Sequence, residues 1–163
     1  FSERWISWIV TFLTTASSRV LVNGCAGAKF MHAQGLHQGD SISPLLFVIA
    51  MDILSAIVAK ASQEGVLSAY TGISATQRLS VYADDVALFV KPSDADLQFV
   101  RHALEIFGEA SGLRVNYTKS TAILISENND DRARVEGILQ CTMSEFPCKY
   151  LGLQLALKQL TRA

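Results

Sequence analysis

The sequence contains few cysteines, almost no net charge and no long uninterrupted hydrophobic run. Each of these features, when present, would point directly to a class of protein. Its three cysteines form neither an even set nor a zinc-knuckle pair, which argues for reduced thiols in an intracellular protein. The formal net charge of -1 carries no basic excess, so overall charge does not indicate nucleic-acid binding. The longest apolar stretch, residues 44–59, is interrupted by Asp52 and is short for a bilayer span, so we expect no membrane partner.

What the sequence does contain is enough apolar material for a buried core. With 163 residues, 50% hydrophobic and 18% charged, it fits one domain of packed helices and strands and excludes a disordered chain. We find no repeat, low-complexity tract or linker that would divide it. Because the chain begins at Phe1 and not at methionine, we expect its start to be a cut through a longer protein.

Hydrophobic periodicity predicts helices alternating with short strands. An amphipathic helix of about three turns follows the capping residue Ser2, and two strands around Asn23-Gly24 form a hairpin whose loop exceeds two residues. A long helix begins at Ser43-Pro44 and fades near Gly65. The remaining predicted elements are an acidic hairpin at 80–90, a helix from Ser93 to Gly112, a strand at 122–125, a helix at 130–140 and a last strand at 150–155. This order suits an α+β fold with helices packed on one face of a sheet.

Two adjacent carboxylates, Asp84 and Asp85, lie between short apolar runs in the segment 80–90. The pattern predicts a strand, a tip formed by the two acids and a second strand. Neighbouring acids repel each other, so a divalent cation would account for the pair, and oxygen-only ligands favour magnesium or manganese. An ordinary surface turn is the alternative interpretation, because Asp is common wherever a chain reverses. Hairpin tips prefer Asn-Gly or Asp-Gly, however, so two acids there favour a functional reason.

The segment Tyr82-Ala83-Asp84-Asp85, downstream of the loop at 35–44, resembles the palm of reverse transcriptases. The resemblance is greatest to enzymes of non-LTR, LINE-type retrotransposons of plants. Three further segments agree in order: residues 1–5, residues 111–120, and Tyr150-Leu151-Gly152. Because the motifs share order and spacing over essentially the whole chain, the resemblance predicts a palm-like antiparallel sheet with helices on one face.

The resemblance also implies an activity, RNA-directed DNA polymerisation, and a site with two Mg²⁺ or Mn²⁺ ions in the complete enzyme. Asp84 would be a principal ligand of the metals, with Asp85 beside it as a second carboxylate. Lys119 would approach the departing pyrophosphate as a cation or proton donor, although an ordinary solvated lysine stays the alternative. Tyr82 would line the site near the primer end.

Binding residues are implied in the same way. Gln38 and Gly39 would lie against the templating base and the incoming nucleotide, where a side chain at Gly39 would crowd the approach. A loop without a ligand is the alternative for this pair. Gly152 would belong to the hairpin that grips the primer. The implied partners are an RNA template, a DNA primer and deoxynucleoside triphosphates, and the implied location is the nucleus or cytoplasm with the element's RNA.

Two positions depart from the family pattern, and some of its parts lie outside the sequence. His37 stands where the family usually has arginine, which replaces a permanent cation by a side chain that is neutral at pH 7, and Ser41 stands where the family usually has proline. The family's other metal-binding aspartate lies upstream of the first helix, and its fingers and thumb are outside 1–163. We therefore expect a partial reverse transcriptase domain that is inactive alone.

Two rival interpretations stay open at the level of sequence. A decayed retroelement remnant would keep the fold but at most bind nucleic acid, and the residues at 37 and 41 favour it. Another palm-like enzyme, such as a nucleotide cyclase, would share the fold without sharing the chemistry. The loop at 38–39 and the segment 150–152 argue against the cyclase.

Overall fold

The computed structural model describes residues 1–163 except 34, 37–38, 126–127 and 158–163. The predicted binding residue Gln38 and the departure at His37 therefore lie outside the described residues. The chain forms two compact units, residues 1–49 and 50–163.

The first unit contains the predicted amphipathic helix and the first hairpin. Helix α1 (Glu3–Thr15) begins after Ser2, whose hydroxyl oxygen accepts a hydrogen bond from the backbone N–H of Trp5 at 3.3 Å. The strands β1 (Ser17–Val22) and β2 (Cys25–Met31) pair antiparallel. The capping signal thus correctly located the start of the helix.

The turn of this hairpin is shorter than the sequence suggested. Val22 pairs directly with Cys25, so the loop consists of Asn23 and Gly24 alone. Both have positive φ, 50° and 80°, as a type I′ turn requires, and Asn and Gly tolerate that conformation better than other residues. The prediction of a longer loop was wrong because the two strands extend up to the turn.

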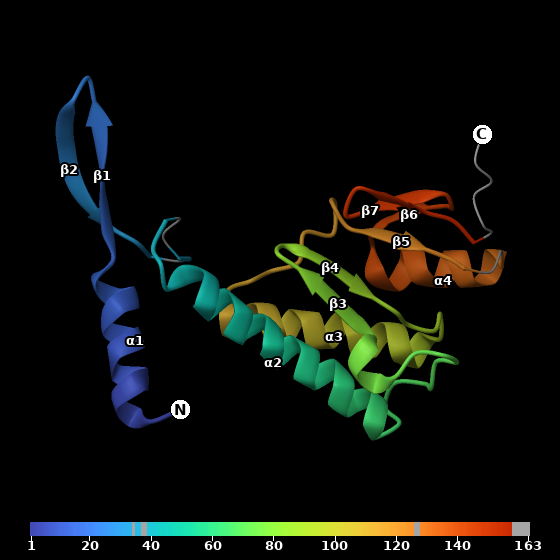
Figure 1. Cartoon of the computed structure of the whole chain (residues 1–163). Helices are drawn as coiled ribbons and strands as arrows, with labels where there is room; N and C mark the ends of the chain where they lie inside the picture. Colours follow the sequence, from blue (N-terminus) through green and yellow to red (C-terminus); the bar gives the residue numbers. More distant parts are fainter. Residues whose placement is uncertain (34, 37–38, 126–127, 158–163) are drawn as a thin grey trace. The chain divides into compact units, whose positions relative to one another are not determined.

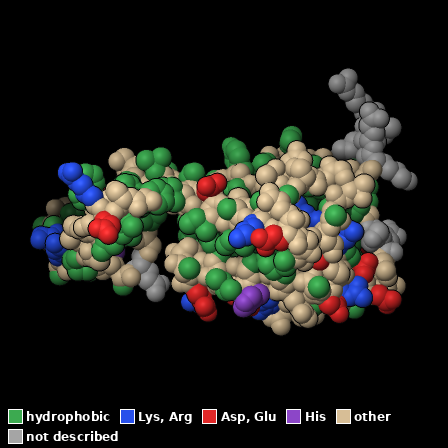
Figure 2. Space-filling model, turned by 90° about the horizontal axis from the view of Figure 1, so that it is seen from below, with side chains coloured by type: hydrophobic (Ala, Val, Ile, Leu, Met, Phe, Trp, Pro, Cys, Tyr) green, Lys and Arg blue, Asp and Glu red, His purple; other side chains and the backbone are tan. Residues whose placement is uncertain are grey.

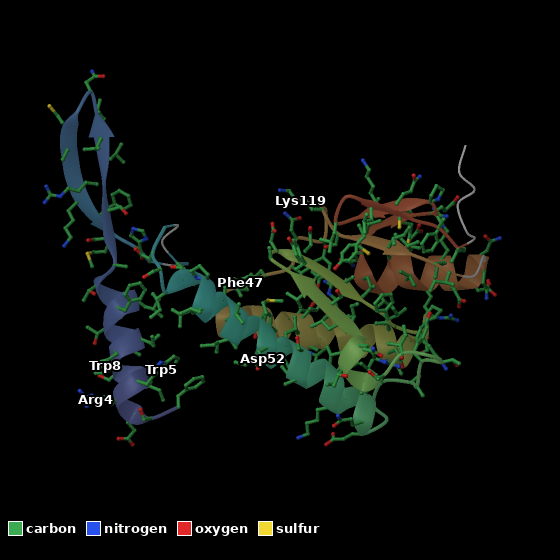
Figure 3. All side chains as sticks on the ribbon, viewed as in Figure 1. Arg4, Trp5, Trp8, Phe47, Asp52 and Lys119 are labelled. Carbon is green, nitrogen blue, oxygen red and sulfur yellow. The ribbon has the colours of Figure 1, made fainter. Side chains whose placement is uncertain are left out.

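Apolar side chains of the first unit are largely exposed. None of its described residues is buried, and Trp8 of α1 keeps 59% of its surface accessible beneath the guanidinium of Arg4, 4.7 Å from the ring centre. Phe1 stacks on Trp5 with ring centroids 4.1 Å apart (Figure 3). Figure 2 shows groups of hydrophobic side chains on the surface, among polar side chains and backbone. Apolar exposure on this scale is typical of surface that another polypeptide or ligand covers.

The core of the second unit lies between two long helices and one hairpin. Helix α2 (Ser43–Gln63) and helix α3 (Asp94–Ser111) run beneath the strands β3 (Leu79–Tyr82) and β4 (Asp85–Leu88) in Figure 1. The buried cluster consists of Val58, Ala61, Leu67 and Val100, and Leu79 and Leu88 pack against it. Residues of α2 and α3 thus pack with one side of this hairpin, through Leu79 and Leu88.

The ends of α3 are as the sequence predicted. The Ser93 hydroxyl oxygen accepts a hydrogen bond from the backbone N–H of Asp96 at 3.2 Å. Gly112 ends the helix with a left-handed φ of 78°. Helix α4 (Asn129–Leu139) follows and contacts α3.

The strands form separate pairs in the described part of the chain, and not the single antiparallel sheet that was predicted. There are four two-stranded sheets. Strand β5 (Thr121–Ile123) pairs parallel with β6 (Thr142–Ser144) across α4. Strands β7 (Cys148–Tyr150) and β8 (Leu153–Leu155) form an antiparallel hairpin where one strand was expected. The fold is α+β, with a short 3₁₀ helix at Ala75–Gln77 leading into β3.

Helix α2 is longer than the apolar stretch 44–59, which by itself is short for a bilayer span. It has 21 residues and is the one helix in the described residues that is long and apolar enough to cross a bilayer. Length and composition alone are weak evidence, because core helices of soluble proteins meet the same criteria. Four of its side chains are buried inside the unit: Met51, Leu54, Val58 and Ala61.

Candidate functional site

The two acids lie at the turn between β3 and β4, displaced by one residue from the prediction. Tyr82 pairs with Asp85, so the turn consists of Ala83 and Asp84, while Asp85 is the first residue of β4. The left-handed φ of 50° falls on Ala83 and not on an acid. A non-glycine residue in this conformation is strained, and such strain clusters at functional sites.

The hairpin β3–β4 has an inner and an outer face. Leu79 and Leu88, directly opposite each other, pack on the core, so they define the inner face. Because side chains alternate along a strand and paired residues share a face, the outer face carries Ser80 and Tyr82 with Asp85 opposite Tyr82. Tyr82 is 65% exposed. The structure therefore places Tyr82 and one acid together on the accessible face.

The donor set at this turn fits a hard divalent cation. Asp84 and Asp85 are both exposed, so their oxygens are accessible. Within the described residues, no group of three or more acidic, histidine or cysteine side chains forms a complete cage. Mg²⁺ usually keeps several waters and binds through one or two carboxylates together with substrate phosphates. The two carboxylates are therefore oxygen donors of a type that Mg²⁺ accepts, and a complete site needs further ligands.

Lys119 lies in a tight turn after α3 that is organised by Asn116. The Asn116 side-chain oxygen accepts hydrogen bonds from the Lys119 backbone N–H at 3.2 Å and from the Thr118 hydroxyl at 2.7 Å. The Ser120 backbone N–H donates to the Asn116 carbonyl at 3.0 Å. In the view of Figure 3, Lys119 lies on the side of the second unit where the β3–β4 turn lies, whereas Asp52 lies away from it. The Lys119 side chain is exposed.

This turn is fastened to the body of the second unit through Tyr117. The Arg101 guanidinium of α3 lies over the Tyr117 ring, 4.6 Å from its centre. The same group donates to the carbonyls of Ile138 and Leu139, at 3.1 and 3.4 Å, at the end of α4. Burial raises the pKa of the Tyr117 hydroxyl above its usual value, and the nearby guanidinium partly opposes this. Arg101 therefore connects the Lys119 turn to both helices.

The segment 150–152 forms the turn of a second hairpin near the first. Leu151 and Gly152 separate β7 from β8, and both have positive φ, 51° and 79°. The Tyr150 hydroxyl lies 3.3 Å from the Ser80 hydroxyl, within hydrogen-bonding distance. Because Ser80 lies on the outer face of β3–β4, the second hairpin meets the face that carries Tyr82 and Asp85.

Gly152 is expected to be required by the backbone of this turn. A Cβ added there would meet nothing within 4 Å, but φ is +79°. Gly152→Ala should lower the free energy of unfolding by about 1 kcal/mol, because L-residues are strained in this region. Gly137→Ala, in α4 at ordinary φ and also with open space, should raise it by about 0.5–1 kcal/mol. Urea unfolding of both variants checks this, and equal effects would contradict the assignment.

Gly39 is described, but its predicted crowding role is not tested. Its φ is +103° and an added Cβ would meet nothing within 4 Å, so the backbone itself explains the glycine. Gly39 belongs to the first unit, and its relation to the acids of the second unit stays a prediction.

Sequence reasoning missed the contact between the two hairpins. Alternation along β3 could have placed Ser80 on the face of Tyr82, but nothing in the sequence indicates that Tyr150, 70 residues away, reaches it. It also missed the role of Asn116, although asparagine is a common turn-organising residue.

These features define an α+β protein that presents paired carboxylates on a hairpin turn beside a second hairpin. The family model for reverse transcriptase (RNA-dependent DNA polymerase) matches residues 1–155. The chain belongs to the reverse transcriptase family, as its motifs predicted.

Two curated proteins are similar to this chain. The Transposon TX1 uncharacterized 149 kDa protein of Xenopus laevis is 27% identical over 129 residues, which are 76% of this chain and 9% of that protein. An uncharacterized mitochondrial protein of Arabidopsis thaliana is 29% identical over 69 residues, which are 41% of this chain and 57% of that protein. The chain thus spans only part of the curated relatives that it matches.

Proposed function

We propose that this chain carries the polymerase site of an RNA-directed DNA polymerase, which adds deoxynucleotides to a primer 3′ end on an RNA template. Family membership supports the reaction class. The observation that carries the proposal is the pair of exposed acids at the β3–β4 turn, with Asp85 on the face that the β7–β8 hairpin meets. Tyr82 is 65% exposed beside Asp85 on this face, so both side chains are accessible to a nucleic acid.

In this proposal Asp84 and Asp85 hold divalent ions. Bound Mg²⁺ or Mn²⁺ would supply positive charge to the transferring phosphoryl group and the primer hydroxyl. The β3–β4 hairpin would hold the two acids in place, because Leu79 and Leu88 pack on the core while the turn itself is exposed. Lys119 would supply a further cation or a proton to the leaving pyrophosphate.

The remaining residues would bind nucleic acid and nucleotide. Tyr82, next to the acids on the outer face, would contact the primer end, and the turn at Gly152 would hold the primer strand. Gln38 and Gly39 would contact the templating base and the incoming deoxynucleotide. Helices behind the inner face, with Tyr82 and Asp85 exposed on the outer face, support a palm-like arrangement of the second unit.

The proposed function is tested by primer extension with the complete open reading frame that contains this chain. A labelled DNA primer annealed to RNA should be extended in the presence of Mg²⁺ and all four deoxynucleotides. EDTA should abolish extension and excess Mg²⁺ should restore it, because the carboxylates act through the ions. Extension that survives EDTA, or that ignores the template sequence, would overturn the proposal. Absence of extension under all conditions would favour the remnant interpretation.

A further inference from the structure

We propose that Tyr150 is a positioning residue, whose hydroxyl fixes the β7–β8 hairpin against the outer face of β3–β4 through Ser80. The contact would set where the primer end lies relative to Asp84 and Asp85. This inference rests on the proposed function, because it assigns a geometric role within the same site.

The first argument is that the two hairpins share no backbone ladder. β3–β4 and β7–β8 are separate two-stranded sheets. Within the described part of the chain, the hydroxyl pair of Ser80 and Tyr150, 3.3 Å apart, is the hydrogen bond that joins them. Both side chains are half-buried, so water competes only partly for this contact. The hydrogen-bonded link between the hairpins in the described chain therefore consists of one pair of side chains.

The second argument is the location of each partner within its own hairpin. Ser80 is two residues before Tyr82 on the same face, about 7 Å along the strand. Tyr150 directly precedes the turn Leu151-Gly152. The contact thus lies close to the turn of each hairpin. A small shift there would displace the primer strand that the β7–β8 turn is proposed to hold. Misplacement of a reacting group by 1 Å can cost about a hundredfold in rate.

The third argument is that the base of β3–β4 is fixed independently. The Arg78 carbonyl accepts a hydrogen bond from the backbone N–H of Phe89 at 2.9 Å, closing the open end of the hairpin. The Arg78 guanidinium is buried and donates to the Ser68 carbonyl. Loss of the Tyr150 hydroxyl should therefore leave β3–β4 in place and release only the second hairpin.

The test uses Tyr150→Phe, Ser80→Ala and the double variant in the complete open reading frame. Each single variant should lower kcat for primer extension about 10- to 100-fold, with less than about a threefold change in KM for deoxynucleotide. The double variant should be no worse than the worse single variant, because both remove the same contact. Tyr70→Phe, a half-buried tyrosine whose hydroxyl has no hydrogen-bond partner in the described chain, is the matched control and should keep wild-type kcat.

A second measurement separates failure of this inference from failure of the proposed function. Amide hydrogen exchange should be faster in β7–β8 of Tyr150→Phe and of Ser80→Ala, and unchanged in α3. Wild-type kcat in both variants, or additive losses in the double variant, would overturn the positioning role even if the wild type is active. If the wild type extends no primer, the proposed function fails, and the positioning role that rests on it falls as well. Unchanged exchange in β7–β8 would overturn the contact itself.

Discussion

Asp84→Asn is expected to lower primer extension by the complete polymerase about a thousandfold. The amide keeps the size of the carboxylate but is neutral, so it removes one of the two charges that the chain offers to a divalent cation. Because Asp84 is exposed at a turn, the substitution should leave the unfolding midpoint unchanged. Single-turnover extension of a labelled primer on RNA, at saturating deoxynucleotide and over a range of Mg²⁺, measures the effect.

Two matched variants sharpen this experiment. Asp85→Asn should also reduce primer extension. The extension rates of the two variants, compared with each other, show how much each acid contributes. Of the two acids, Asp85 is the one that belongs to a strand. Asp52→Asn changes an exposed acid on α2, away from the turn in Figure 3, and should extend primers at the wild-type rate. Equal extension by wild type and Asp84→Asn would remove Asp84 from the site.

Local signals predicted the fold well where a few neighbouring residues decide the structure. The hydroxyls of Ser2 and Ser93 accept hydrogen bonds from helix N–H groups within three residues, and Gly112 takes a conformation that glycine favours. Such effects are carried by adjacent residues, so composition and spacing reveal them.

The pairing of the later strands was not predictable in the same way. The hairpin at 148–155 was missed because Leu151, a residue that rarely has positive φ, occupies its turn. The parallel pair of β5 and β6 depends on α4 returning the chain, which no local pattern reports. For the site, the motif identified Asp84 and Asp85, but the register of the turn and the Ser80 contact required the fold.

Asp96→Ala is expected to lower the free energy of unfolding by about 3 kcal/mol, because it removes a buried carboxylate that is hydrogen-bonded to Ser68. Asp96 is 1% exposed in the first turn of α3. Its oxygens accept from the Ser68 N–H at 3.1 and 3.2 Å and from the Ser68 hydroxyl at 2.8 Å. Alanine would remove these bonds to a buried charge and leave the Ser68 donors without partners. Urea unfolding of the 163-residue chain measures the loss.

The control is Asp94→Ala, two residues earlier on the same helix. Its side chain is 69% exposed and pairs with Arg134 at 2.8 Å, so its loss should cost less than about 1 kcal/mol. A loss of similar size in both variants would show that the effect belongs to the helix terminus and not to burial.

The cost of losing Asp96 should extend to the acidic hairpin, because Ser68 lies between two buried side chains of opposite charge. Its N–H and hydroxyl donate to Asp96, and its carbonyl accepts from Arg78, the residue directly before β3. Arg78 is 1% exposed, and its Nη1 atom has no hydrogen-bond partner within the described chain. Without Asp96, Ser68 would lose the side chain that holds it, which would weaken the bond of its carbonyl to Arg78 at the start of β3. Hydrogen exchange in Asp96→Ala should therefore accelerate in β3–β4 more than in α4, and the reverse order would show that this network does not support the hairpin.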